Sequence, residues 1–143
     1  MKRIILAVLL LVVCATPSFA DTSIKAEVDK PILTTDETLI YKIVVTSTEK
    51  KLPQPQIPQL EGFKIISQAS SSTASFLKSE IKSILVFAFI LSPLEVGKFE
   101  IKPATIKIGD KVYSSQAFDI EVKQLPTGPG GEIPESTEPQ INL

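Results

Sequence analysis

The 143-residue sequence contains no histidine and no tryptophan, and it has a single cysteine. Without histidine, the chain lacks the commonest general base and the commonest metal ligand of enzymes. A Ser-His-Asp triad is therefore impossible. One cysteine cannot form an intramolecular disulfide, so a folded domain has to be held together by the packing of its core.

The N-terminus has the pattern of a secretory signal peptide. Lys2 and Arg3 precede an apolar run, Ile4–Val13, and small residues follow. This pattern predicts export and cleavage between Ala20 and Asp21. The apolar run is shorter than the roughly 20 residues that cross a bilayer, so we do not interpret it as a membrane-spanning helix. We expect a periplasmic or other extracytoplasmic location in the envelope.

Cys14 lies inside the predicted signal peptide. A lipoprotein processing site is an alternative interpretation of this cysteine, but Val13 stands where such a site has a small residue. We therefore expect Cys14 to be removed with the signal, and we expect no direct membrane insertion of the remaining chain.

The charged residues are few and of mixed sign. After removal of residues 1–20, thirteen basic and sixteen acidic residues would remain, which gives a net charge of −3. Nucleic-acid binding needs clustered lysine and arginine to release counterions from phosphates, whereas these residues alternate here with acids. We therefore predict no nucleic-acid partner.

Beyond residue 20 the dominant hydrophobic period is two, which indicates β-strands. Apolar and charged residues alternate in 24–28, and the run 39–45 places four apolar side chains on one face: Leu39, Tyr41, Ile43 and Val45. A polar stretch at 34–37 predicts a turn between these two strands. The segment Leu52–Pro58 carries three prolines, so we expect it to be extended and outside any central ladder.

The second half of the sequence predicts further strands. We expect Gly62 to open a short strand with Phe63 and Ile65 directed inward, and we interpret Ser67–Ser75 as an exposed loop or a ragged edge strand. The apolar run Ile84–Leu91 predicts a strand buried on both faces. Alternation in 99–101, 106–108 and 118–122 predicts more strands, with a hairpin at residues 109–110.

Seven to eight short strands without helical interruption predict an all-β fold. The expected architecture is an immunoglobulin-like two-sheet sandwich over residues 21–123. The cysteine pair and core tryptophan of antibody domains are absent, so the similarity concerns architecture alone. Residues 124–143 are rich in proline and glycine and predict a disordered tail or linker.

Few residues remain that could support catalysis. The spacings Ser75–Lys78 and Ser79–Lys82 match a Ser-Lys dyad, but its companion motifs are missing, and a solvated loop is the preferred interpretation. Glu100, Asp119 and Glu121 are expected on outward strand faces beside lysines rather than in a cleft. No run of aspartates predicts a calcium site. We therefore expect no catalytic residue, no metal and no cofactor.

One strand could carry a binding surface. If the inward residues of Ile84–Leu91 are Leu85, Phe87, Phe89 and Leu91, then Val86, Ala88 and Ile90 lie on the opposite face. These three residues form a weak candidate interaction patch. Two interpretations stay open: a neighbouring loop or the proline-rich segment covers them, or they form a docking surface for a partner.

Two stretches have a distinctive spacing of proline, glycine and aromatic residues. LPQPQIPQLEGF, from Leu52 to Phe63, places spaced prolines before a Gly-Phe strand start. LSPLEVGKFEIKPATIKIGDKVYSS, from Leu91 to Ser115, contains Gly-x-Phe-x-Ile-x-Pro-Ala and then Gly-x-x-x-Tyr-x-Ser. The order and spacing of these motifs resemble the BatD-type oxygen-tolerance, or aerotolerance, family. The resemblance covers most of residues 24–123 and corresponds to a single N-terminal-like β-sandwich domain.

The resemblance implies a membrane-associated envelope protein whose sandwich domains face the periplasm. It also implies partners among membrane proteins with von Willebrand A-type domains and a MoxR-type ATPase system, and it implies no catalytic residues. Members of the family commonly carry repeated sandwich domains and a membrane anchor. Because this sequence shows neither a second sandwich nor an anchor, we interpret it as a single-domain member or a truncated product.

We therefore predict a non-catalytic protein-interaction module of the periplasm or envelope. The alternative is a carbohydrate- or peptidoglycan-binding β-sandwich module, since such sandwiches often bind sugars. Sugar-binding surfaces use exposed aromatic rings, and with no tryptophan and only Tyr41 and Tyr113 this alternative is weaker. A third hypothesis, an enzyme acting through carboxylates, would need two close acids in a cleft.

Overall fold

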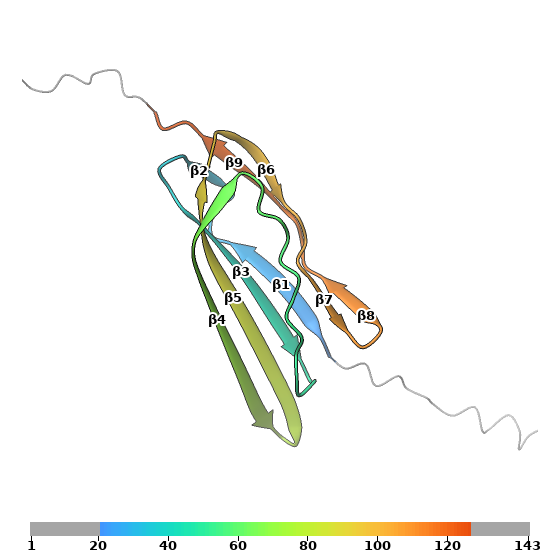
Figure 1. Cartoon of the computed structure of the whole chain (residues 1–143). Helices are drawn as coiled ribbons and strands as arrows, with labels where there is room; N and C mark the ends of the chain where they lie inside the picture. Colours follow the sequence, from blue (N-terminus) through green and yellow to red (C-terminus); the bar gives the residue numbers. More distant parts are fainter. Residues whose placement is uncertain (1–20, 127–143) are drawn as a thin grey trace, which may run out of the picture.

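The computed structural model describes residues 21–126, and within this range the chain forms nine β-strands and no helix (Figure 1). The predicted all-β class is confirmed, with slightly more strands than the seven to eight expected. The predicted signal peptide, Cys14 and most of the predicted tail lie outside the described residues. The strands are β1 (Ser23–Val28), β2 (Ile32–Thr34), β3 (Leu39–Ser47), β4 (Phe63–Leu77), β5 (Glu80–Pro93), β6 (Gly97–Ile101), β7 (Thr105–Ile108), β8 (Lys111–Ser114) and β9 (Phe118–Lys123).

The strands are arranged as a sandwich. One layer is sheet A, with the order β1-β3-β5-β4 and antiparallel pairing throughout. The other layer consists of sheet B, with the order β2-β9-β6, and of the two-stranded sheet C formed by β7 and β8. In sheet B, β2 runs parallel to β9, whereas β6 is antiparallel to it. Figure 1 shows the long strands of sheet A on one side and sheets B and C on the other.

The core lies between these layers and is supplied by alternate residues of each strand. On β3 the predicted inward face is confirmed, because Leu39, Tyr41, Ile43 and Val45 are all buried. The Tyr41 ring stacks on Phe89 of β5, with 6.1 Å between ring centroids, and meets Phe118 of β9 edge-on at 6.4 Å. The facing layer contributes Ile101, Ala104, Ile106, Ile120 and Val122. Each large buried side chain contributes about 1.5 to 3 kcal/mol to folding.

Gly62 and Phe99 form a close contact between the two layers. Gly62 has a φ of +82°, and a Cβ atom at this position would overlap with Cδ1 and Cε1 of the Phe99 ring. Phe63 packs edge-on against the same ring, at 5.6 Å between centroids. The Leu94 N–H donates to the Gly62 carbonyl at 2.9 Å. Gly62 and Phe63 of the Gly-Phe strand start therefore contact Phe99 of the Gly-x-Phe motif.

The proline-rich segment between β3 and β4 lies outside the central ladders, as predicted. Its only ladder contact within the described residues is an isolated bridge between Gln56 and Thr105, made by two backbone hydrogen bonds of 2.7 and 3.2 Å. Pro55 is buried, and Leu52 and Leu60 pack against the core. The segment therefore helps to close the interior rather than extending a sheet.

β4 and β5 form a hairpin that is longer than its neighbours. The pairing of β3 with β5 stops at Ser47 and Ser83, whereas β4 and β5 remain paired as far as Leu77 and Glu80. The tip of the hairpin extends past the ends of β1 and β3 in Figure 1. The two-residue turn consists of Lys78 and Ser79, both with positive φ, at 50° and 66°. Positive φ at both central residues is the backbone of a type I′ turn.

Three expectations for this hairpin are wrong in whole or in part. Ser67–Ser75 is a largely exposed part of an edge strand, as one of the two interpretations held, but it is not ragged: continuous pairing with β5 keeps it regular and extended despite its small polar side chains. Ile65 was expected to be buried but is 44% exposed. Ile84–Leu91 was expected to be buried on both faces, but Ile90 is exposed and its neighbours on the same face are half-buried, since no described element forms a third layer there.

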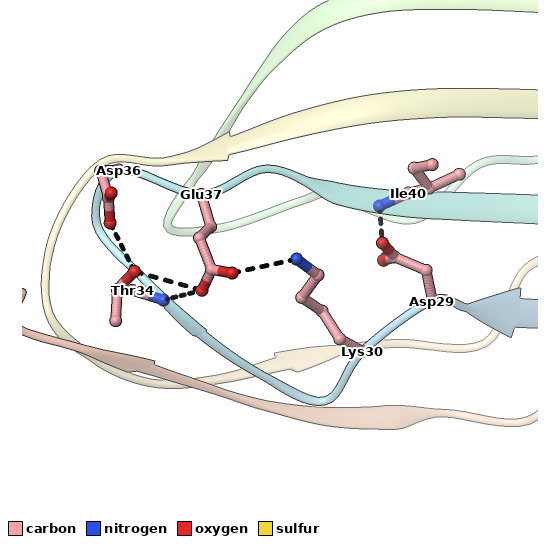
Figure 2. A network of polar contacts seen from close by, with 6 residues as sticks. All are labelled: Asp29, Lys30, Thr34, Asp36, Glu37 and Ile40. Carbon is pink, nitrogen blue, oxygen red and sulfur yellow. Dashed lines mark hydrogen bonds and ion pairs between the residues drawn. The ribbon is translucent and has the colours of Figure 1, made fainter.

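The predicted turn at 34–37 is stabilised by side chains that bind backbone (Figure 2). Glu37 Oε2 accepts the Thr34 N–H at 2.8 Å, and Glu37 Oε1 lies 3.2 Å from Lys30 Nζ. The Thr34 N–H and the lysine lower the pKa of the Glu37 carboxyl. Asp29 Oδ1 accepts the Ile40 N–H at 2.8 Å and so fixes the end of β1 beside the start of β3. These acids stabilise the connection between the two layers.

The contact between Gly62 and Phe99 can be tested with Gly62→Ala. We expect a loss of about 2 to 4 kcal/mol in the free energy of unfolding, because the alanine Cβ adds a steric overlap to the cost of positive φ. The measurement is urea denaturation followed by circular dichroism. Gly109→Ala is the matched control, since Gly109 also has positive φ, at +62°, but no atom lies within 4 Å of the position that a Cβ would occupy there. Equal losses for the two variants would contradict the contact.

The turn between β4 and β5 predicts a stabilising change. Lys78→Asn combined with Ser79→Gly should raise the free energy of unfolding by about 1 kcal/mol, because asparagine and glycine adopt positive φ more readily than lysine and serine. The control is Lys50→Asn combined with Lys51→Gly. Because φ is not positive at these two positions, this change should not raise the free energy of unfolding. Stabilisation by both changes, or by neither, would argue against the type I′ geometry. Urea denaturation of the three proteins decides between these outcomes.

Tyr41 predicts a loss of stability at high pH. Burial raises the pKa of its hydroxyl from 10.0 to about 12, and an interaction with Ser115 opposes this only in part. Between these values the unfolded chain releases a proton that the folded chain retains, so stability is complete below pH 10 and declines as pH rises through 12. Tyr41→Phe should remove this component, which is on the order of 2 kcal/mol. Identical slopes of unfolding free energy against pH for both proteins would contradict it.

Candidate interaction surface

The outer side of sheet A carries a group of apolar side chains. The inward residues of β3 and β5 alternate with outward ones, and the antiparallel register places Ile40 opposite Ile90 and Val44 opposite Val86. We define the outer patch as Ile40, Val44, Ile84, Val86, Ala88 and Ile90. Ile40 is 45% and Ile90 is 38% exposed, and the other four residues are half-buried. The patch contains all three residues singled out from the sequence, and it adds residues of β3 that the sequence reasoning missed.

A charged residue interrupts the outer patch on β3. Lys42 lies between Ile40 and Val44 on the same face, opposite Ala88 of β5, and its Nζ is 3.7 Å from Glu27 Oε2 of β1. This pair directs the lysine toward β1 and away from β5. On the β4 side, small residues lie next to the patch, with Ala69 opposite Ala88 and Ser71 opposite Val86. The result is an apolar strip that is continuous on β5 and is interrupted by Lys42 on β3, with Glu27 on the β1 side and small residues on the β4 side, a composition that typically marks an interface.

The proline-rich segment lies on the other side of this sheet. Gln54 and Ile57 line a hollow together with Phe87 and Phe89, and these two aromatic side chains belong to the inward face of β5. The segment therefore covers the inward side of the hairpin, not the outer patch. The expected inward orientation of the odd-numbered residues of β5 agrees with this arrangement.

The two Ser-x-x-Lys spacings lie on the β4–β5 hairpin, not on a helix. Ser75 lies opposite Lys82, and its hydroxyl donates to the Lys82 carbonyl at 3.4 Å. Lys78 and Ser79 form the turn itself. The hairpin does not provide the helical spacing that a Ser-Lys dyad requires.

The acidic residues of sheet B are closer together than the sequence suggested. The register of β6 with β9 places Glu100 directly opposite Asp119, and Lys98 opposite Glu121. With Ile32 these residues border a shallow depression on the outer side of sheet B, where Glu100 and Asp119 are exposed. The outward orientation is as expected, and the two acids lie on an open surface. No group of three or more potential metal ligands occurs among the described residues.

The two tyrosines do not form an aromatic binding platform. Tyr41 is fully buried in the core, and Tyr113 on β8 is half-buried against it. The alternative of a sugar-binding surface therefore gains no support from the two aromatic residues on which it depended.

These features define a small immunoglobulin-like β-sandwich module with an apolar strip on one outer sheet face. The chain belongs to the BatD family, because the family model of the BatD DUF11 like domain matches residues 26–122. The resemblance seen in the sequence is thereby confirmed, and the protein is a BatD-like envelope module. No curated protein and no solved structure gave a match to the chain. In the part that the structure describes, no helix is long and apolar enough to span a membrane.

Proposed function

We propose that this protein is a non-catalytic interaction module that is exported to the periplasm or an equivalent envelope compartment and binds another protein through the outer patch. The observation that carries the proposal is the apolar strip on β3 and β5. Ile40 and Ile90 form an exposed cross-strand pair there, and Val44 and Val86 continue it along the same face. Burial of such a strip by a partner would be favourable at about 25 cal/mol for each Å² of apolar surface.

The surroundings of the strip also suit a protein partner. Lys42, within the strip, is ion-paired with Glu27 of β1 at its border, while the small residues of β4 leave room for larger side chains of a partner. The acids of sheet B lie on the opposite layer of the sandwich and take no part in this surface.

Family membership suggests the class of partner. The BatD-type resemblance points to membrane proteins with von Willebrand A-type domains and to a MoxR-type ATPase system, in a process linked to oxygen tolerance. Of these, a von Willebrand A-type domain exposed on the same side of the membrane is the partner that we propose for direct contact with the outer patch.

Ile90→Glu tests the proposed surface. We expect it to weaken binding to a purified von Willebrand A-type domain from the same organism by at least about tenfold, or 1.4 kcal/mol, because it places an unpaired charge in the apolar strip. Isothermal titration calorimetry with the full chain measures the change. Circular dichroism should show that the variant is folded, since residue 90 is already partly exposed.

Val112→Glu is the matched control for this experiment. Val112 is an exposed apolar residue on β8, outside sheet A, so its replacement should leave binding unchanged. Equal weakening by both variants would show that charge alone matters and would remove the outer patch from the proposal. Absence of binding between the unaltered chain and the von Willebrand A-type domain would remove the proposed partner class.

A further inference from the structure

The outermost strand of sheet A has a free edge. β4 is 15 residues long and pairs with β5 on one side, and no other described strand pairs with it (Figure 1). Alternate backbone N–H and C=O groups of β4 are therefore directed away from the sheet. Such groups are a template for pairing with a further strand.

This edge lacks the features that usually prevent strand addition. Between Lys64 and Lys78 the sequence has no charged residue and no proline. The one irregularity is the bulge at Ile66, near the beginning of the strand, and the ladder from Ser67 to Leu77 is regular. Proteins normally protect long edges with lysine, proline or bulges along their length.

The opposite edge of the same sheet is protected. β1 carries Lys25 and Glu27, and the side-chain amide of Gln116 binds both backbone groups of Ala26. Its Nε2 donates to the Ala26 carbonyl at 2.7 Å, and its Oε1 accepts the Ala26 N–H at 3.5 Å. Since β1 is both charged and covered, the exposure of β4 is specific to one edge of the sheet.

The sequence of β4 is complementary to itself. Residues 67–75 read SQASSSTAS, so antiparallel pairing of two copies about Ser71 brings only small or neutral side chains together. Ser67 would lie opposite Ser75 of the other copy, and Ala69 opposite Thr73. Within this stretch no pair combines two like charges or two bulky residues, which are the usual obstacles to close strand pairing.

The same register would bring together large apolar residues that are exposed at the two ends of β4. Phe76 is 74% and Ile66 57% exposed. They are ten positions apart along one strand, or about 33 Å, and cannot contact each other within one chain. Pairing centred on Ser71 brings Phe76 of each copy to Ile66 of the other, at the bulge where the regular ladder ends. Both ends of the ladder would then gain apolar contacts that a single copy cannot make.

The register also brings Lys64 of each copy toward Lys78 of the other, at the outer limit of the pairing. Lys78 belongs to the turn rather than to β4, and both lysines are exposed. Because long lysine side chains can direct their charge into solvent, this approach opposes the pairing only weakly.

We propose that two copies of this protein associate through the free edges of β4, antiparallel and centred on Ser71, so that the two four-stranded sheets join into one continuous sheet. The symmetry is twofold, because antiparallel pairing of identical strands about one residue makes the same contacts from each side. The interaction differs from the proposed partner binding, since it uses the edge of the sheet rather than its outer face.

Charge substitution at the symmetry centre tests this arrangement. Ser71→Lys and Ser71→Glu should each weaken dimerisation by at least about tenfold, because the new charge faces its own copy across the twofold axis. An equimolar mixture of the two variants should restore the dimer, since a lysine then faces a glutamate. Sedimentation velocity of the full chain over a series of concentrations gives the dissociation constant of each sample.

Thr38→Lys is the control, because Thr38 is exposed, lies outside the strands and should leave the dimer unchanged. Restoration by mixing also rules out misfolding as the cause of the losses in the single variants. A monomeric unaltered protein at all concentrations would overturn the proposal. So would dimers that persist in both single variants, or two monomeric variants that fail to associate when mixed.

Discussion

Packing of the inward side chains of β3 and β5 against sheets B and C is the interaction on which the rest of the molecule depends. The chain has one cysteine, outside the described residues, so no intramolecular disulfide supports this interior. Tyr41 lies at the centre, in contact with Phe89 of its own sheet and Phe118 of the facing layer. Because side chains alternate along a strand, fixing this inward set also fixes which residues face outward. The position of the outer patch is thus a consequence of the core.

The strands and their inward side chains could be predicted from the sequence wherever a strand has one buried face and one solvent-exposed face. On β3 the alternation of apolar and polar residues identified the four buried side chains correctly, since burial requires this contrast between faces. The turn glycines and prolines also indicated the strand boundaries near Pro93 and Gly109. The family-like motifs were recognised from spacing alone, and the contact between Gly62 and Phe99 supplies a physical reason for that spacing.

The strands whose form or burial was predicted wrongly lack this contrast. In Ser67–Ser75 both faces are small and polar, so no period of two is visible, and only the ladder to β5 defines the strand. In Ile84–Leu91 both faces are apolar, which suggested burial on both sides, although only one layer covers the strand. The pairing of Glu100 with Asp119 depends on the register between β6 and β9, which is long-range and has no local signature in the sequence.

The side chain of Gln116 has a consequence for how far edge-to-edge association could proceed. By occupying the N–H and C=O of Ala26, its amide acts in place of one residue of an additional strand. A protein with two open edges could recruit copies without limit and grow into fibrils. With the β1 edge of sheet A occupied in this way, only the β4 edge of this sheet is open to strand addition, and growth along sheet A would end after a single step.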